Sequence, residues 1–439
     1  MTPCCSTGRD CRWAQWRLIV TALAVVLLSD NRSPAERMSP AAPKPISAES
    51  PKLVLAHYMP WYVASPEWGL HWAGPQQQHA PGKLDDAGLP DIWSHYHPLI
   101  GTYESADRDV IECHLLQMKL AGIDGVILDW YGISDAADYP SIDRASKKVV
   151  QVAERLGMKL AICFEDRTIQ RLVETGKLRR SEIQDHLIET LQWLQDNWFG
   201  APNYVRNDGR PLLLNFGPLY VRDPGIWKAA LDSLPVRPQF FALDYLWKDA
   251  GADSGFAWIY PHIWQGEPTE TEVHTALTKQ FAAISSEPTQ VIVSACPGFN
   301  DVYANSYPQI DHRDGATLKE SLEAALRGPW PIVQLVTWND YGEGTMIEPT
   351  HEFGYRFLEI VQQARREEAT SASNFDAKDL QLPARLYKLR KSDSVSQTKL
   401  DRIGESISLG FLDEARAALD RLTISAIPAV KRVVRTDLR

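Results

Sequence analysis

Eight short apolar segments, separated by stretches of helical periodicity, constrain the fold of this chain most strongly. The segments are 53–58, 125–130, 159–165, 211–216, 239–244, 256–260, 290–296 and 331–338. Apolar residues recur at i, i+3 and i+4 between them, which predicts helices at 105–121, 144–157, 181–196, 225–234, 270–285, 317–327 and 352–366. Strands that alternate with helices in this way predict an α/β fold, a (β/α)8 TIM barrel.

Two features qualify this interpretation. The stretch 245–255 is too short and too rich in Gly and Asp for a crossover helix, so we expect a single turn there. The structural alternative is a doubly wound open sheet, which would carry a glycine-rich phosphate turn after its first strand. No such turn follows Tyr58, and the barrel is therefore the favoured architecture.

Other segments flank the predicted barrel domain, which we assign to residues 52–369. Residues 1–30 have the order of a signal peptide, because arginines precede the apolar run 18–28 and polar residues follow it. Residues 31–51 are rich in Pro and Ala and are interpreted as a linker. Residues 370–439 form a helical C-terminal extension, with helices expected at 379–390 and 396–423 that pack on the barrel or on a partner.

The signal peptide predicts an exported protein, periplasmic or secreted. The apolar run is shorter than the roughly 20 residues of a membrane helix. An uncleaved N-terminal membrane anchor is the alternative, because no A-x-A cleavage site follows the run. Beyond the leader only Cys113, Cys163 and Cys296 remain, and we interpret this odd, widely spaced set as buried free thiols.

Composition narrows the class of partner. The net charge of −10 and the lack of a Lys/Arg-rich stripe exclude a nucleic-acid partner. The 15 tryptophans, many beside Gly, Pro or His, favour a carbohydrate, because flat rings stack on sugars. We expect no cofactor and no metal, since His and acidic residues occur at no ligand spacing such as H-x-x-x-H.

Polar and aromatic residues gather where the predicted strands end, the face that carries the active site in a TIM barrel. Carboxylates could move protons on a sugar, and aromatic rings could stack on its apolar face. We predict as substrate-binding residues His57, Tyr58, Trp61, Trp72, Asp129, Trp130, Glu165, Asp166, Asn215, Asp244, Tyr245, His262, Trp264, Trp338 and Asn339.

Structural roles are the alternative for these side chains. Glu165 and Asp166 could pair with Arg167. Asp129 and Asp244 could cap the helices that follow them. The tryptophans could pack in the core, and the histidines could be hydrogen-bonded groups of the rim.

The most specific motif follows the last predicted strand. Residues 337–344 read Thr-Trp-Asn-Asp-Tyr-Gly-Glu-Gly, with Ile-Glu-Pro at 347–349. This motif resembles the signature of glycoside hydrolase family 71, the α-1,3-glucanases, as does the His-Tyr-Met triplet at 57–59. The related family 99, the endo-α-mannosidases, has Glu at the position of Asp340, and its first loop resembles residues 68–72. The resemblance to this 71/99 group covers about residues 52–366.

The resemblance implies that Asp340 and Glu343 are the catalytic carboxylates. Like charges at this spacing push the two pKa values apart, so that one group can hold a proton near neutral pH. Family 71 implies inversion, with one acid protonating the glycosidic oxygen and the other activating water. Family 99 implies retention, in which the substrate's own 2-hydroxyl attacks C1 with help from residue 340, and Glu343 is the acid/base. The shorter Asp340 favours the inverting scheme.

The sequence therefore predicts a glycosidase, an O-glycosyl hydrolase that cleaves α-linked polysaccharide of the α-1,3-glucan or α-mannan type. One alternative is a non-catalytic barrel that binds carbohydrate. Another is a glycan-assembly protein associated with a glycosyltransferase, although no diphosphate-binding turn or Asp-x-Asp motif stands at a strand end. The sugar, the linkage, endo or exo action and the oligomeric state stay open.

Overall fold

The computed structural model describes residues 52–64, 67–259, 291–304, 308–368, 375–392 and 395–426, with the isolated positions 275 and 278. The predicted signal peptide and linker, 1–30 and 31–51, lie outside these residues, as does almost all of the predicted helix 270–285. Within the described part of the chain, no helix has the length and apolar character that crossing a membrane requires.

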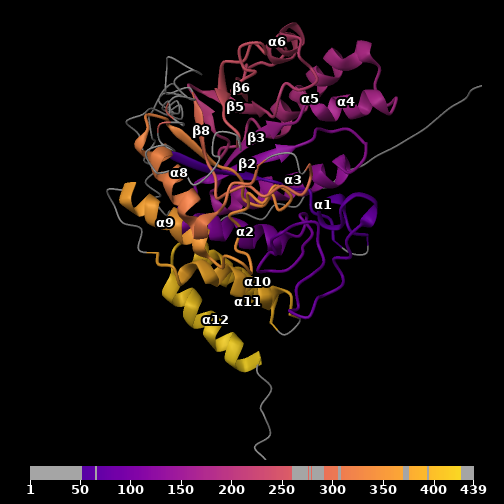
Figure 1. Cartoon of the computed structure of the whole chain (residues 1–439). Helices are drawn as coiled ribbons and strands as arrows, with labels where there is room; N and C mark the ends of the chain where they lie inside the picture. Colours follow the sequence, from indigo (N-terminus) through magenta and orange to yellow (C-terminus); the bar gives the residue numbers. More distant parts are fainter. Residues whose placement is uncertain are drawn as a thin grey trace, which may run out of the picture. The chain divides into compact units, whose positions relative to one another are not determined.

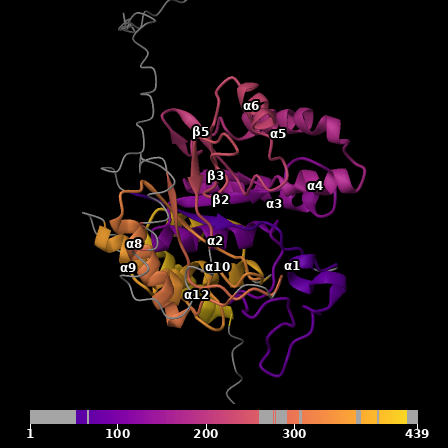
Figure 2. The ribbon, with the colours of Figure 1, turned by 45° about the horizontal axis from the view of Figure 1, so that its top comes forward.

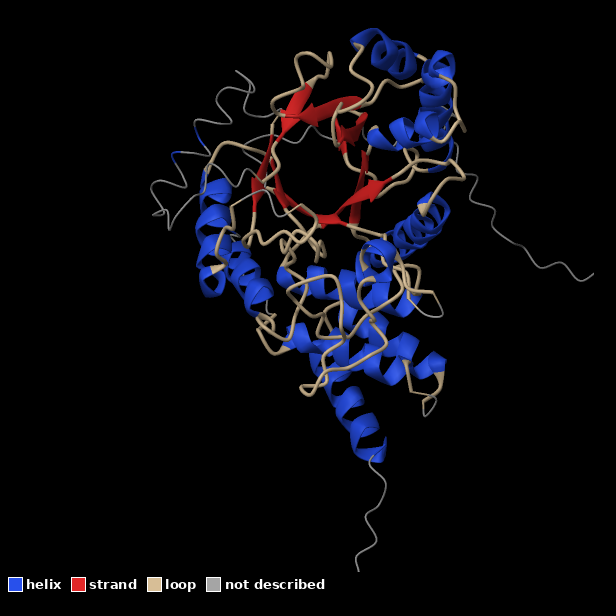
Figure 3. Ribbon diagram, turned by 45° about the vertical axis from the view of Figure 1, so that its right-hand side comes forward, coloured by secondary structure: helices blue, strands red, loops and turns tan. Residues whose placement is uncertain are grey.

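Eight parallel strands close into a barrel, which confirms the predicted fold (Figure 3). The ring closes because β1 pairs with β9 and β3 pairs with β5. Its strands are β1 (Leu53–Tyr58), β2 (Gly125–Trp130), β3 (Lys159–Phe164), β5 (Arg210–Asn215), β6 (Gln239–Leu243), β7 (Ser254–Phe256), β8 (Ile292–Ala295) and β9 (Ile332–Leu335). The short β4 (Arg206–Asn207) adds an antiparallel pairing to β5 that the sequence pattern did not predict.

Helices surround the strands on the outside of the ring (Figure 3). The barrel helices are α2 (Arg108–Ala121), α3 (Tyr139–Leu156), α4 (Arg167–Glu174), α5 (Ile183–Asn197), α6 (Pro224–Asp232), α8 (Ala316–Arg327) and α9 (Arg356–Glu368). Single turns are α1 (Leu70–Ala73), η2 (Pro75–Gln77), η3 (Arg180–Glu182), η5 (Arg313–Gly315) and η6 (Asp379–Gln381). The chain between β6 and β7 forms only turns, as expected, whereas α4 was not predicted.

Alternation along the strands divides the core into two layers. Successive side chains of a strand point to opposite faces, so Leu55 and Ile127 pack inside the barrel while Val54 and Val126 pack against the helices. Both faces are covered, which is why these strands appear in the sequence as continuous apolar runs. Gly125 lets β2 approach β3, since a Cβ there would lie 2.1 Å from the carbonyl oxygen of Lys159.

The C-terminal extension consists of α10 (Leu382–Arg390), α11 (Gln397–Ser408) and α12 (Leu412–Ala426). The single helix predicted at 396–423 is broken at Gly410, whose φ of +81° lies in the left-handed region. Helix α10 packs on the barrel helix α2, and α11 and α12 pack on α10 (Figures 1 and 2). The barrel therefore provides the surface on which the extension packs.

A buried ion cluster joins the extension to the barrel. Glu112 of α2 is 3% exposed, and its Oε2 lies 2.7 Å from Nε of Arg390 on α10. Its Oε1 accepts a hydrogen bond of 2.8 Å from Arg155 on α3. Glu112 thus depends on cations from two other helices for compensation of its buried charge.

We predict that Arg390→Ala lowers the free energy of unfolding by about 3 kcal/mol, because it leaves the buried Glu112 with only the half-exposed Arg155. The control is Arg385→Ala on the same helix, which removes a solvent-exposed pair with Asp420 and is expected to cost about 0.5 kcal/mol or less. Urea unfolding of both variants measures the difference. Equal losses would contradict the proposed role of the cluster.

Candidate active site

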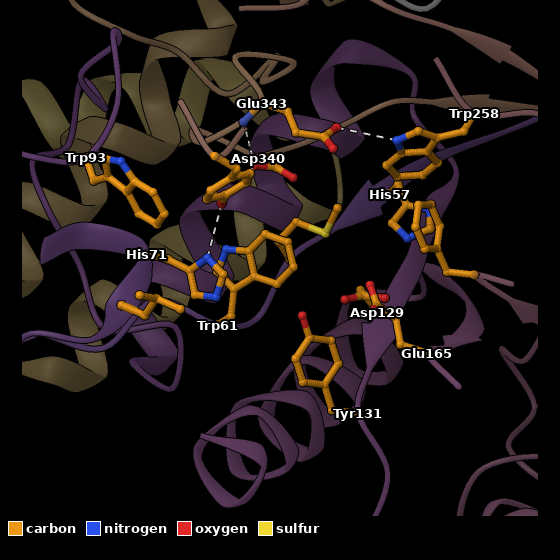
Figure 4. A pocket seen from close by; sticks show the side chains of 14 residues that line it. His57, Trp61, His71, Trp93, Asp129, Tyr131, Glu165, Trp258, Asp340 and Glu343 are labelled. Atoms are coloured by element: carbon orange, nitrogen blue, oxygen red, sulfur yellow. Dashed lines mark hydrogen bonds between the residues drawn. The ribbon is translucent and has the colours of Figure 1, made fainter. Parts of the chain in front are cut away.

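A pocket opens at the carboxyl ends of the barrel strands, the face on which TIM-barrel enzymes carry their active sites (Figure 4). Strand ends and the loops that follow them supply its walls. The lining residues are His57, Met59, Trp61, Leu70, His71, Trp93, Asp129, Tyr131, Glu165, Phe216, Trp258, Tyr303, Asp340 and Glu343.

The structure brings part of the predicted site together. The predicted residues that line this pocket are Asp340, Glu343, His57, Trp61, Asp129 and Glu165. They come from the ends of β1, β2, β3 and β9, which are adjacent in the ring. Both proposed catalytic carboxylates are therefore in one pocket with acids and rings from neighbouring strands.

Several predicted aromatic residues lie in the core instead. Tyr58 and Trp130 follow His57 and Asp129 directly, so their side chains point to the opposite face of the strand. The Tyr58 hydroxyl is hydrogen-bonded to His114, and the Trp130 ring packs on Trp193 and Trp198.

Trp72 and Trp338 are also fully buried and do not line the pocket. The Trp72 indole donates to the carbonyl oxygen of Tyr103, and the Trp338 ring lies against His114. The structure thus gives these two tryptophans packing roles in place of the predicted stacking on sugar.

Three of the predicted polar residues, Asp166, Asn215 and Asn339, do not line the pocket and support the surrounding structure. The Asp166 carboxylate accepts hydrogen bonds from the backbone N–H groups of Leu219, Tyr220 and Val221, at 2.7–2.9 Å. Asn215 is fully buried and shares the helix-facing side of β5 with Leu213.

The Asn339 amide donates to the carbonyl oxygen of Met59 and accepts from its N–H group. It therefore ties the loop after β9 to the end of β1. Asp244 and Tyr245 do not line the pocket, and His262 and Trp264 lie outside the described residues.

Sequence reasoning missed several lining residues. Tyr131 and Trp258 each lie two positions beyond an inward-facing residue, Asp129 and Phe256, so period-two alternation could have found them. Trp93 and Tyr303 come from long loops and His71 from the single turn α1, and no periodic signal marks them.

Asp340 is held by hydrogen bonds that favour its ionised form. Its Oδ1 accepts from the N–H of Glu343 at 3.0 Å and from the Tyr303 hydroxyl at 3.3 Å. Burial disfavours the charge more strongly and raises the pKa of Asp340 to about 7, while these bonds and one from the N–H of Gly342 lower it. Asp340 is thus a carboxyl group that exchanges its proton near neutral pH.

Glu343 is in an environment that favours the protonated form. Burial and the nearby Asp340 and Asp301 raise its pKa well above the ordinary range. The opposing contact is a hydrogen bond of 3.4 Å from the Trp258 indole to Oε2 (Figure 4). Because Asp340 accepts more and shorter hydrogen bonds, Glu343 is the member of the pair that keeps its proton to higher pH.

A second acidic pair, Asp129 and Glu165, lies together in the pocket below His57 in Figure 4. Burial, followed by the charge of Asp166, raises the pKa of Glu165 to about 7. Burial and the neighbouring Glu165 raise the pKa of Asp129 well above its usual range. No Lys or Arg is among the described residues of the lining, so no cation of the pocket wall compensates the charge of these two acids.

Rings and a glycine position the groups around Asp340. Trp61 stacks on His71, with ring centroids 4.2 Å apart, and His71 Nδ1 lies 3.1 Å from the Tyr303 hydroxyl (Figure 4). Burial lowers the pKa of His71 to about 3, so the ring is neutral. A Cβ on Gly342 would lie 1.9 Å from Cζ of Tyr303, so the glycine lets Tyr303 reach Asp340.

A buried network supports the loop that carries the pair. Glu348 accepts from the Tyr103 hydroxyl at 2.8 Å and lies 3.1 Å from His114 Nε2. Tyr103 in turn accepts from the Asn339 amide at 3.1 Å. These bonds join the loop after β9 to the loop after β1 and to α2. They therefore hold the loop that carries Asp340 and Glu343 in place.

One group of described side chains has the donor atoms of a metal site. His57, Asp129 and Cys163 each offer one ligand atom, and these atoms lie within 4.8 Å of one another. The three residues are far apart in sequence, which is why ligand spacing did not reveal them.

The model of glycosyl hydrolase family 99 matches residues 51–359, which confirms the resemblance seen in the sequence. A mouse glycoprotein endo-alpha-1,2-mannosidase is 23% identical over 322 residues, 67% of each chain. A zebrafish protein named glycoprotein endo-alpha-1,2-mannosidase-like is 25% identical over 313 residues, 66% of each. The solved GH99 endo-alpha-mannosidase from Bacteroides thetaiotaomicron shares the fold, with a TM-score of 0.53 and 20% identity over 72% of this chain and 98% of its own.

We predict that Asp340→Asn changes how stability depends on pH. A carboxyl whose pKa is higher in the folded than in the unfolded chain binds more protons when folded, so its contribution is lost as the pH rises from about 4 to about 7. The wild type should therefore lose up to about 1.4 kcal/mol per pH unit relative to Asp340→Asn in this window. Urea unfolding from pH 4.5 to 7.5 measures this, and a difference that stays constant with pH would contradict it.

Proposed function

The chain belongs to glycosyl hydrolase family 99, and on that premise we propose that it cleaves α-linked mannosides in mannan-type glycans, with Asp340 and Glu343 as the catalytic pair. Membership of this family makes the chain a glycosidase, as the sequence predicted.

The observation that carries the proposal is the unequal environment of two adjacent carboxyl groups. Asp340 accepts two backbone N–H groups and a phenol, which favour its ionised form. Glu343 accepts one long hydrogen bond and faces like charge. Neighbouring acids whose pKa values are pushed apart in this way are suited to act as base and acid. We assign the base to Asp340 and the acid to Glu343.

The proton movements follow from this assignment. Glu343 gives its proton to the glycosidic oxygen as the bond from that oxygen to C1 breaks. Asp340 takes the proton of the attacking hydroxyl, so charge is conserved within the pocket. In the second half of the reaction, the Glu343 carboxylate takes a proton from the attacking water. Asp340 returns its proton to the oxygen of the hydroxyl from which it came.

The family supports the 2-hydroxyl of the sugar as the attacking group. In this scheme the 2-oxygen bonds to C1 and forms a strained ring, which water then opens with overall retention. The sequence-based expectation of inversion depended on the resemblance to family 71 and on the short side chain of Asp340. The family match favours retention, and we propose that Asp340 serves the 2-hydroxyl despite its shorter side chain.

A mannoside is supported by the relatives and by the lining of the pocket. The mouse and zebrafish relatives carry names that refer to endo-α-1,2-mannosidase. Rings such as Trp61 and Trp258 offer stacking surface, and the described lining has no cation that would bind a diphosphate. These features favour a neutral glycan and disfavour a sugar nucleotide, the substrate that the glycan-assembly alternative would require.

We also propose that the protein is exported, because arginines, an apolar run and polar residues succeed one another in residues 1–30. N-terminal sequencing of the protein recovered from the periplasm or medium tests this. Retention of the chain in the cytoplasm with its N-terminus intact would refute export.

We predict that Asp340→Asn and Glu343→Gln each reduce kcat on α-1,2-linked mannan oligosaccharides by about 10² or more, because each removes a proton-transfer group. The control is Glu352→Gln in the same region, whose carboxylate pairs with His97 outside the pocket and whose loss should leave kcat within about twofold. New reducing ends measure the rate. Undiminished cleavage by either pocket variant would refute the assignment of the catalytic pair. Cleavage of α-1,3-glucan and of no mannan would refute the proposed substrate.

We predict that the first-formed product has the α configuration at its new reducing end. Attack by the 2-hydroxyl and opening by water each invert C1, so two inversions give retention. Proton NMR in the first minutes of hydrolysis, before mutarotation, distinguishes the anomers. A β product would restore the inverting scheme.

We predict a bell-shaped pH profile of kcat/KM, because Asp340 must be ionised and Glu343 protonated. Tyr303→Phe removes a hydrogen bond that lowers the pKa of Asp340, so the acidic limb should move to higher pH by about one unit. Tyr96→Phe, which removes a hydroxyl bonded to Asn300 away from the pocket lining, should leave the limb unmoved. If the acidic limb is unchanged in Tyr303→Phe, Tyr303 does not control the pKa of the base.

A further inference from the structure

Three adjacent strands bring an imidazole, a carboxylate and a thiol together inside the barrel, where His57 and Asp129 line the pocket and Cys163 is buried beside them. His57, Asp129 and Cys163 are each the last residue but one of their strands, β1, β2 and β3. Their ligand atoms lie within 4.8 Å of one another. Asp129 and Cys163 are register partners, and His57 pairs with Ile127, two residues before Asp129. All three side chains therefore project to the inside of the barrel.

The hydrogen bonds around His57 leave one ring nitrogen available. The Gln334 amide nitrogen donates to Ser294 Oγ at 2.8 Å and to the carbonyl oxygen of Ala257, which can only accept. The amide oxygen of Gln334 therefore faces His57 Nδ1, at 3.4 Å, and Nδ1 must carry the proton. In this tautomer Nε2 has a free lone pair. A histidine that binds a metal usually donates its other ring N–H to an oxygen acceptor, and Gln334 Oε1 has that position at His57.

Asp129 supplies the second, independent sign of a ligand. Its side chain is 2% exposed and lines the pocket, and its Oδ2 has no hydrogen-bond partner among the described residues. A buried carboxylate oxygen without a donor is costly unless a proton or a cation satisfies it. Because Asp129 and His57 both line the pocket, an ion can reach them through its mouth.

We propose that His57, Asp129 and Cys163 form a binding site for a borderline-soft divalent cation of the Zn²⁺ class, and that its occupation inhibits the enzyme. Imidazole, carboxylate and thiolate are the ligands that Zn²⁺ takes in proteins. Three protein ligands leave a fourth position for water on the side of the pocket. Binding displaces the thiol proton into solvent, since the thiolate is the ligand.

The side chains must move inward to bind the ion. With Zn–S near 2.3 Å and Zn–N and Zn–O near 2.0–2.2 Å, ligand atoms around a tetrahedral ion lie roughly 3.5 Å apart. The observed separations of up to 4.8 Å therefore require side-chain shifts of about 1 Å. The site is therefore one that the ion completes by drawing in its ligands.

Inhibition follows from the place of the site, and this part of the inference rests on the proposed function. His57 and Asp129 share the pocket with Asp340 and Glu343. A bound cation would occupy the space of a sugar and withdraw Asp129 from it. Zn²⁺ should therefore raise KM, and the effect should disappear with the metal site.

The test uses Co²⁺ as the probe, because a thiolate ligand gives it a near-ultraviolet charge-transfer band. Every sample is the full chain with Cys4, Cys5 and Cys11 replaced by Ser, so that the leader contributes no thiol. We expect one equivalent of Co²⁺ to give the band in this background and in Cys296→Ser, a matched buried thiol outside the site. Cys163→Ser should lose the band and bind Zn²⁺ about tenfold or more weakly by calorimetry.

A band that persists in Cys163→Ser, or no band in the parent, would overturn the proposal. Should Cys163→Ser fail to fold, parent crystals soaked in Zn²⁺ decide the question. An anomalous peak among the three side chains supports the site, and a peak elsewhere or none refutes it. Inhibition is tested by the rate of hydrolysis with Zn²⁺, divided for each variant by its own rate without the metal. Absence of hydrolysis on every glycan would refute the proposed function and leave the result of the Co²⁺ titration standing.

Discussion

Burial of carboxyl groups at one end of a closed barrel is the constraint on which this structure depends. Four acids share the pocket, no cation is among its described lining, and removal from water raises the pKa of each. Such a cluster is tolerable because protons and hydrogen bonds replace cations. Within such a cluster, carboxyl groups with different hydrogen bonds differ in how readily they ionise. Asp340 and Glu343 differ in this way, and we assign their roles as base and acid from that difference.

The surrounding fold maintains the difference. The loop after β9 is tied to the end of β1 through Asn339 and Met59, and its carbonyl groups at 342 and 343 accept from the loop after β8. These contacts fix Tyr303 over Gly342, where its hydroxyl reaches Asp340. Precise placement of this kind is costly in stability, because the same burial that adjusts the pKa values weakens the folded state as the pH rises.

The sequence predicted the barrel because buried parallel strands are continuous apolar runs, and β1 and β2 were predicted with their observed bounds. The motif at 337–344 placed Asp340 and Glu343. Errors arose where adjacent residues were both assigned to the site, since Tyr58 and Trp130 must face away from the pocket if His57 and Asp129 face it. Trp93 and Tyr303 could not be predicted, because long loops have no periodicity and only tertiary contacts place them. The same holds for Cys163 beside His57 and Asp129.

The most direct measurement of the central claim is a neutron crystal structure of the deuterated protein near pH 7. It locates the protons of the four pocket acids without a substrate or an assay. The account predicts deuterium on the Glu343 carboxyl group and partial or no deuterium on Asp340, with Tyr303 donating to Asp340 Oδ1. Deuterium on Asp340 together with an ionised Glu343 would reverse the two roles and contradict the account.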